Sequence, residues 1–213
     1  MITTVLNNIF QKHEQIDIGK GILAPIQKTN AKQGPVKKLR PVILLPMIRK
    51  VMSNIILFRI QPKVDKYLSQ SQSAYRPGRS TSDIVWLHRF LAARIQKFEE
   101  EIYITGIDMS NAFDTIRRST LIETLQSFLE EDEVRMIRVL LSNTTLEIKT
   151  NNIPTQSFTS NTGSPQGDGL SGCLFDIYFE MFLRKLRDEL DSSAIPTEIK
   201  YLNSIPEEAI YIC

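Results

Sequence analysis

The segment from Ile104 to Phe113, which reads I-T-G-I-D-M-S-N-A-F, constrains the fold more than any other part of the sequence. The β-branched and apolar residues before Asp108 predict a short strand over residues 101–108 that ends at Asp108. Met109, Ser110 and Asn111 are typical of a turn that leads into a helix. The sequence therefore predicts a mixed α and β fold in which a strand ends on a carboxylate.

Size and composition are those of an ordinary globular chain. The 213 residues, 42% of them apolar, can bury one core, or one core with an incomplete neighbour. No run reaches the length of a membrane span and residues 1–10 lack the blocks of a secretory signal, so we expect no membrane association and an intracellular protein. Cys173 and Cys213 have no metal-ligand spacing and are expected to be reduced. The net charge of +2 is too small to identify a nucleic-acid partner, although basic residues gather in the first third of the chain.

Hydrophobic periodicity predicts an alternation of strands and helices along the chain. Two strands around a basic loop are expected first, then a helix that Pro62 ends, then a helix with Trp86, Phe90 and Ile95 on its buried face. The predicted elements are strands at 16–26 and 36–45, helices at 47–64, 81–100, 119–129 and 131–141, strands at 146–149 and 155–161, a helix at 170–190, and the start of a strand at 209–213.

A second informative segment, Gly163 to Ser171, reads G-S-P-Q-G-D-G-L-S. Its glycines allow the backbone to approach a ligand closely, and Gln166 offers amide donors and an acceptor. These are features that a nucleotide site needs. An ordinary turn before a helix would also contain Gly and Pro, so this segment taken alone leaves both interpretations open.

The carboxylate of Asp108 is suited to the chemistry of nucleotide addition. This reaction is an in-line phosphoryl displacement that two divalent ions, about 4 Å apart and held by carboxylates, accelerate by stabilising charge. Mg²⁺ prefers oxygen ligands, so Asp108 and the backbone carbonyl of Met109 are candidate metal ligands. The alternative is that Asp108 caps the helix that follows. Asp114, beyond Phe113, is expected to cap a helix or lie on the surface.

Phe113 has two possible roles. An aromatic residue at helical spacing commonly belongs to the core. At this distance from Asp108, however, a rigid ring beneath the sugar of a bound nucleotide would clash with a ribose 2′-hydroxyl and so select deoxynucleotides. That second role also argues against an RNA-directed RNA polymerase, which has to accept ribonucleotides.

Four segments together resemble the reverse transcriptase domain of non-LTR (LINE-type) retrotransposons, from about Leu23 to Cys213. Residues 39–46 are similar to the R-P-I-x-L-L-P pattern of that family, and residues 73–81 to its Q-x-G-F-R-x-G-R-S-T element. Asp108 to Asp114 matches D-x-x-x-A-F-D, and residues 163–171 match the second palm motif, with Phe175 at the place of the aromatic in L-F. Four motifs in order are far more specific than one.

The resemblance implies an α+β fold of the right-hand polymerase type, with fingers over residues 1–101, a partial palm over residues 102–213 and no thumb. It also implies Mg²⁺-dependent, RNA-directed DNA synthesis on an RNA template and a DNA primer with deoxynucleoside triphosphates. The site residues that it implies are Asp108 as catalytic metal ligand, Phe113 as sugar gate, Gln166, Arg40 and Lys28 as nucleotide contacts, and Arg76 and Arg79 as contacts to the nucleic-acid backbone.

The sequence departs from the family pattern at its last residues. Relatives carry a Y-A-D-D turn whose paired aspartates complete the metal site, whereas here Tyr211 is followed by Ile212 and Cys213. Asp168 and Asp188 are not expected to replace these paired aspartates, because an acidic residue in a loop or at the charged end of a helix is ordinarily a surface residue. The resemblance therefore predicts that these residues alone are inactive or nearly so. A non-catalytic remnant that binds RNA or a partner is the alternative.

Overall fold

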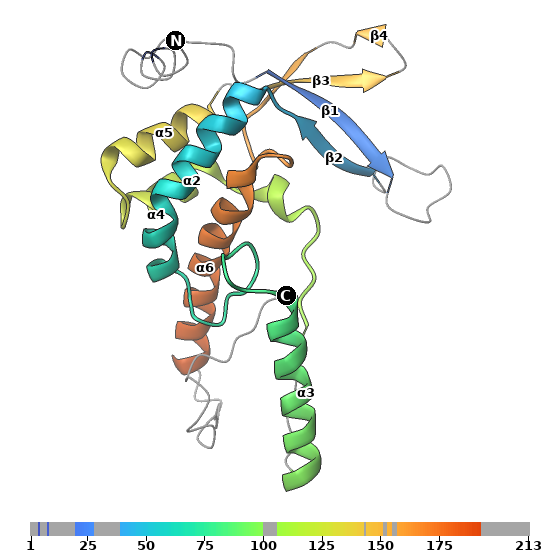
Figure 1. Cartoon of the computed structure of the whole chain (residues 1–213), viewed down its shortest axis with the longest axis vertical. Coiled ribbons are helices and arrows are strands. Elements are labelled where there is room, and N and C mark those ends of the chain that lie inside the picture. The colour runs from blue at the N-terminus through green and yellow to red at the C-terminus, as the bar shows by residue number, and fades with distance from the viewer. Residues whose placement is uncertain are drawn as a thin grey trace.

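A computed structural model describes residues 20–27, 39–99, 106–142, 144–150, 153–154 and 157–192, together with positions 4 and 8. A sheet lies at one end of the molecule and helices make up the rest (Figure 1). The predicted mixed α and β fold is confirmed at this level. Residues 101–105 of the predicted strand, Lys28 and everything after residue 192 lie outside the described residues. Residues 106–108 are irregular, so the prediction that this strand runs to Asp108 is wrong.

The sheet joins the two halves of the sequence. Strands β1 (Lys20–Gln27) and β2 (Leu39–Leu44) form the expected antiparallel hairpin, in which Ile26 pairs with Arg40. Strand β3 (Thr144–Thr150) pairs with β1 in parallel, and β4 (Ile153–Pro154) and β5 (Phe158–Ser160) pair with β3. Strands near β3 and β5 were predicted, but the parallel pairing of β1 with β3 could not be predicted from periodicity. It attaches the N-terminal hairpin to the part of the chain that follows the carboxylate motif.

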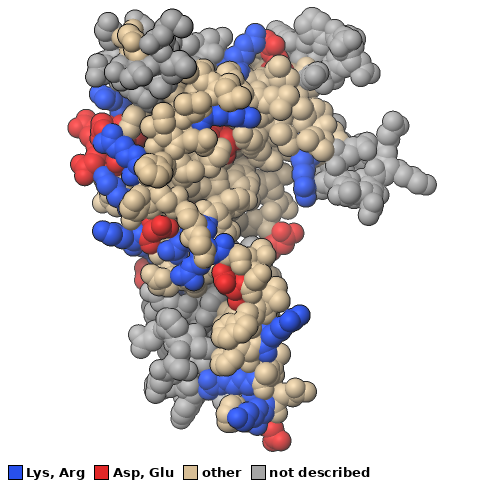
Figure 2. All heavy atoms as spheres, in the orientation of Figure 1, with Lys and Arg blue, Asp and Glu red and all other residues tan. Residues whose placement is uncertain are grey.

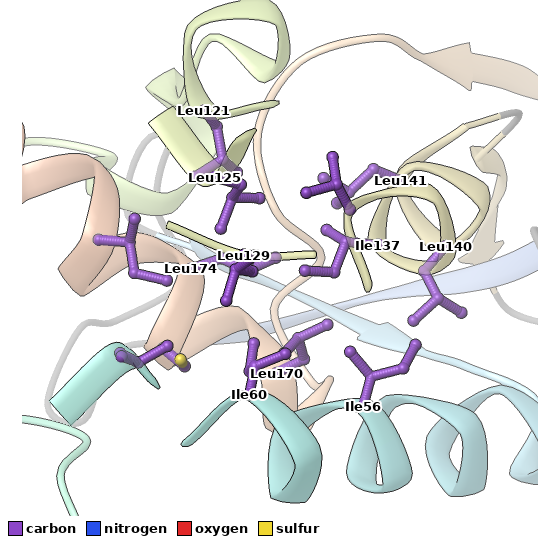
Figure 3. Close-up of a cluster of buried hydrophobic side chains, with 14 of the residues drawn as sticks. Ile56, Ile60, Leu121, Leu125, Leu129, Ile137, Leu140, Leu141, Leu170 and Leu174 are labelled. Carbon is purple, nitrogen blue, oxygen red and sulfur yellow. The ribbon is translucent and has the colours of Figure 1, made fainter. Parts of the chain in front are cut away.

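The core lies between four helices, α2 (Met47–Tyr67), α4 (Arg118–Gln126), α5 (Glu131–Leu141) and α6 (Gly169–Ser192). Ile56 and Ile60 of α2 point toward leucines of the other three helices (Figure 3), and both are fully buried. Their spacing of four residues places them on one face of the helix. Among the described residues, no helix has the length and apolarity needed to cross a bilayer.

The predicted end of the first helix at Pro62 is wrong. Helix α2 continues to Tyr67 with Pro62 inside it. A proline within a helix costs about 3 kcal/mol, because it removes a hydrogen bond and crowds the preceding turn. Ile60 and Val64 flank it and are fully buried. Burial of such side chains contributes roughly 1.5 to 3 kcal/mol each, so tertiary packing outweighs the local preference.

The predicted buried face of the helix α3 (Thr81–Phe98) is also wrong. Trp86 is 66% exposed and Phe90 is 39% exposed, whereas Ile84 and Leu87 are buried. Helix α3 projects away from the other described helices (Figure 1), so few side chains are available to cover it. Its start at Thr81 agrees with the predicted range, and Ser80 and Asp83 form a capping box there.

Candidate active site

The two segments that the sequence singled out lie against each other. The short 3-10 helix η2 (Ala112–Thr115) follows the carboxylate motif, and the amide of Ser164 donates to the carbonyl of Phe113 at 2.9 Å. Gly163 has a φ of +73°, and a Cβ on it would lie 2.9 Å from Cα of Asp114. Only glycine combines this backbone conformation with so close an approach. The Gly-Ser-Pro-Gln-Gly segment therefore makes a close backbone contact, beyond the turn that it also forms.

Strand β2 contacts the same loop from the other side. The amide of Ile43 donates to the carbonyl of Gln166 at 2.7 Å. Gly167 has a φ of +119°, and a Cβ on it would lie only 2.4 Å from the carbonyl oxygen of Ile43. Arg40 lies on the same strand with its side chain exposed. These contacts link the strand that carries Arg40 to the loop that carries Gln166.

Gln166 has a partner that sequence analysis missed. Its side chain forms a hydrogen bond with the carboxylate of Asp114. Desolvation raises the pKa of Asp114, and the hydrogen bond from Gln166 opposes that shift. Asp114 is exposed, as expected of a surface residue. Its contact with Gln166 nevertheless connects the end of the carboxylate motif directly to the glutamine amide.

Phe113 is half-buried within an aromatic cluster. Its ring centroid lies 5.0 Å from that of Phe175 on α6 and 6.0 Å from that of Tyr75. The position is compatible with both interpretations of this residue, because the ring packs against the protein while part of it stays accessible to a ligand.

Asp168 is not a surface residue, so that expectation is wrong. Its side chain is 4% exposed, and its Oδ2 lies 3.6 Å from Nε of Arg49, whose side chain is 1% exposed. Ser53 donates a hydrogen bond to the same carboxylate oxygen at 2.8 Å. Burial lowers the pKa of Arg49 and the charge of Asp168 opposes that shift. The ion pair ties the Gln166 loop to α2, which accounts for an acidic residue between two glycines.

Arg118 fixes the chain just before this loop. Its guanidinium donates to four backbone carbonyls, and no feature of the sequence identified it in advance. The acceptors are Gly163 at 2.8 Å, Leu141 at 2.6 Å, Ser160 at 2.8 Å and Thr162 at 3.0 Å. Burial lowers the pKa of Arg118, and the nearby charge of Arg49 acts in the same direction.

Asp108 lies in the irregular segment 106–109 with its side chain exposed. The expected alternative, that Asp108 caps the following helix, is wrong, because Asn111 occupies the N-cap position of η2. Met109 is 39% exposed. An accessible carboxylate beside an accessible backbone is a suitable donor set for a hard cation such as Mg²⁺. Within the described residues, no three His, Cys, Asp or Glu side chains gather into a metal-binding group.

The remaining predicted site residues are basic, and those that the structure describes differ in how accessible their side chains are. Lys28 lies outside the described residues. Arg76 is largely engaged within the protein, since it pairs with the carboxylate of Asp65 at 3.3 Å and donates to backbone carbonyls of Ser69, Gln72 and Asp65. Arg79 is exposed and donates to Gln70 at 3.2 Å. Arg79 is therefore the more accessible of the two residues expected to contact nucleic acid.

Comparison with known proteins identifies the family of this chain. A family model described as reverse transcriptase (RNA-dependent DNA polymerase) matches residues 26–202. The transposon TX1 uncharacterized 149 kDa protein of Xenopus laevis is 28% identical over 188 residues, which make up 87% of this chain and 14% of that protein. The chain thus spans a small part of the length of this relative.

Solved structures also match. The partial Cas6-RT-Cas1--Cas2 complex is 20% identical with a TM-score of 0.48, and the match covers 88% of this chain and 29% of that chain. The Cas6-RT-Cas1--Cas2 complex matches with the same identity and TM-score and is covered to 18%. The family match, which extends over most of the sequence, decides the assignment. The chain belongs to the reverse transcriptase (RNA-dependent DNA polymerase) family.

Proposed function

We propose that this chain is part of the RNA-directed DNA polymerase of a non-LTR retroelement. The observation that carries the proposal is the direct contact between the Asp108–Asp114 segment and the Gly163–Ser171 loop, in a chain of the reverse transcriptase family. The similarity to a transposon protein supports the retroelement origin. On this proposal residues 1–101 correspond to fingers and residues 102–213 to part of a palm, inside the cell.

The metal site is proposed to use the carboxylate of Asp108 and the carbonyl of Met109. Mg²⁺ held there would neutralise charge on the phosphates of a deoxynucleoside triphosphate. Arg40 and Lys28 are proposed to bind the triphosphate, and a planar guanidinium suits this role because it can donate two hydrogen bonds to phosphate oxygens. Gln166, held by Asp114 and by the amide of Ile43, is proposed to contact the nucleotide.

The ring of Phe113 is proposed to exclude the ribose 2′-hydroxyl. Its contacts with Phe175 and Tyr75 support this role, because a gate has to resist displacement. Arg79 and Arg76 are proposed to neutralise backbone phosphates of the RNA template and DNA primer, and Arg79 is the more accessible of the two. Figure 2 shows basic side chains spread over one face of the molecule without a single dominant patch, so the contacts are expected to be distributed.

RNA-templated primer extension tests the function. Two-metal chemistry needs a second set of carboxylates, and these 213 residues contain no adjacent aspartate pair. We therefore expect residues 1–213 alone to give almost no extension with Mg²⁺. The same residues continued through a strand with paired aspartates should extend the primer, and an Asp108→Asn change in that protein should reduce the rate by about a thousandfold or more. Robust synthesis by residues 1–213 alone, or full activity of Asp108→Asn, would contradict the proposal.

A non-catalytic RNA-binding role is the second candidate. One observation favours it, because α3 carries exposed aromatic and basic side chains together. Trp86 and Phe90 stack at 5.5 Å, and the charged groups of Arg94 and Lys97 lie 5.8 and 5.2 Å from the ring of Phe98. Exposed rings beside basic groups are a means of binding single-stranded nucleic acid. This candidate predicts RNA binding that needs neither Mg²⁺ nor Asp108.

A further inference from the structure

Tyr75 has an unusual backbone and a constrained ring. Its φ is +49°, a left-handed conformation that few residues with side chains adopt. Its ring lies over Gly172 of α6 so closely that a Cβ on Gly172 would be 2.4 Å from Cδ1 of Tyr75. The adjacent Arg76 anchors this loop through the carbonyls of Ser69 and Gln72. Tyr75 is thus constrained by the close approach of its ring to Gly172 and by the anchored loop, although the residue is 59% exposed.

The constrained ring of Tyr75 meets Phe113. The two ring planes are inclined at 82° with centroids 6.0 Å apart, the edge-to-face arrangement that aromatic quadrupoles favour. Phe175 contacts Phe113 from α6 with centroids 5.0 Å apart. Phe113 therefore packs against two rings from different parts of the chain, and only Tyr75 belongs to the loop that carries Arg76 and Arg79.

We propose that Tyr75 is a positioning residue that holds the ring of Phe113 in place and so sets the discrimination between deoxyribonucleotides and ribonucleotides. The inference rests on the proposed function, in which Phe113 lies beneath the sugar of the bound nucleotide. A gate that works by steric clash discriminates only while it cannot move aside. Removal of Tyr75 would leave one side of Phe113 open, and the ring could then rotate away from a 2′-hydroxyl.

The first test follows the ring of Phe113 directly. A 4-fluorophenylalanine placed at position 113 of the full chain reports its surroundings by fluorine NMR without any nucleotide. Tyr75→Ala should shift the resonance or split it into more than one, while Tyr75→Phe should keep it near the original position. Phe98→Ala is a matched control, because Phe98 is 58% exposed and belongs to α3. An unchanged resonance in Tyr75→Ala would overturn the proposal.

The second test measures selectivity. Equilibrium dialysis is done with dATP and with ATP, in Mg²⁺ and with an RNA template annealed to a DNA primer. It gives the dissociation constant for ATP divided by that for dATP, a ratio that measures selection of the deoxynucleotide. Tyr75→Ala should reduce that ratio by roughly tenfold, Phe113→Ala by at least as much, and Tyr75→Phe by very little. If Phe113→Ala lowers the ratio and Tyr75→Ala does not, the positioning role is refuted while the gate stands. If Phe113→Ala itself leaves the ratio unchanged, the proposed gate fails and Tyr75 loses its role with it.

Discussion

Replacement of Asp168 by alanine is expected to lower the free energy of unfolding by about 3 to 5 kcal/mol, because it leaves the buried guanidinium of Arg49 without its carboxylate. The Arg49 and Asp168 side chains are 1% and 4% exposed, so water cannot readily replace the lost interaction. The positive charges of Arg49 and Arg118 also repel each other, and the carboxylate of Asp168 would no longer offset that repulsion. Ser53 would lose its acceptor as well.

Urea unfolding of the unchanged chain and four variants measures this effect. Asp168→Ala and Arg49→Met should each be strongly destabilised, whereas the double variant should lose clearly less than the sum of the two single losses, because the uncompensated charge is gone. Asp188→Ala is the control, since Asp188 is an exposed aspartate on α6, the helix that follows Asp168. Single variants within about 0.5 kcal/mol of the unchanged chain would show that this ion pair does not hold the loop.

Asp176 is expected to make the stability depend on pH. This residue of α6 is 2% exposed, and burial raises its pKa to about 7, although a hydrogen bond from Gln72 and the charge of Arg76 oppose that rise. Because the unfolded chain keeps a pKa near 3.8, the folded state binds more protons between these two values. The free energy of unfolding therefore falls as the pH rises from about 4 to about 7, by up to roughly 4 kcal/mol from this group.

The Asp176→Asn variant should abolish that component. Gln72 donates to Oδ1 of Asp176 at 2.8 Å, while Asp176 Oδ2 and Gln72 Oε1 have no partner among the described residues. An asparagine amide can keep the first hydrogen bond and offers a donor to Gln72 Oε1, as a protonated carboxyl does. Relative to the unchanged chain, Asp176→Asn should therefore gain stability at pH 8 and gain little at pH 4. Urea unfolding at both pH values measures the difference, and an equal difference at the two would refute the assignment.

Much of the secondary structure could be predicted because local patterns determine it. Helix α5 has the bounds that periodicity predicted, since three acidic residues begin it and its apolar residues recur at helical spacing. The errors lie where distant contacts decide. Burial of Ile60 and Val64 carries α2 through Pro62, and the projection of α3 leaves Trp86 exposed.

The site was predictable to the extent that its residues lie in sequence motifs. The motifs predicted that Phe113 and Gln166 belong to one site, which stays a prediction, and the structure shows a backbone contact between their segments. The residues that support them come from elsewhere, because the carbonyls that Arg118 binds are up to 45 positions away and Ser53 lies 115 positions from Asp168. Tyr75 and Asp114 belong to recognised motifs, but only the folded chain shows which residue each one contacts.

Binding of dATP to residues 1–213, with and without Mg²⁺, tests the central claim most directly. The claim is that Asp108 ligates the metal of a nucleotide site that also contains Phe113 and Gln166. Equilibrium dialysis should show binding that Mg²⁺ strengthens, and the Asp108→Asn variant should lose most of that Mg²⁺-dependent gain, about tenfold or more in dissociation constant. Binding by Asp108→Asn that equals the unchanged chain and responds equally to Mg²⁺ would contradict it.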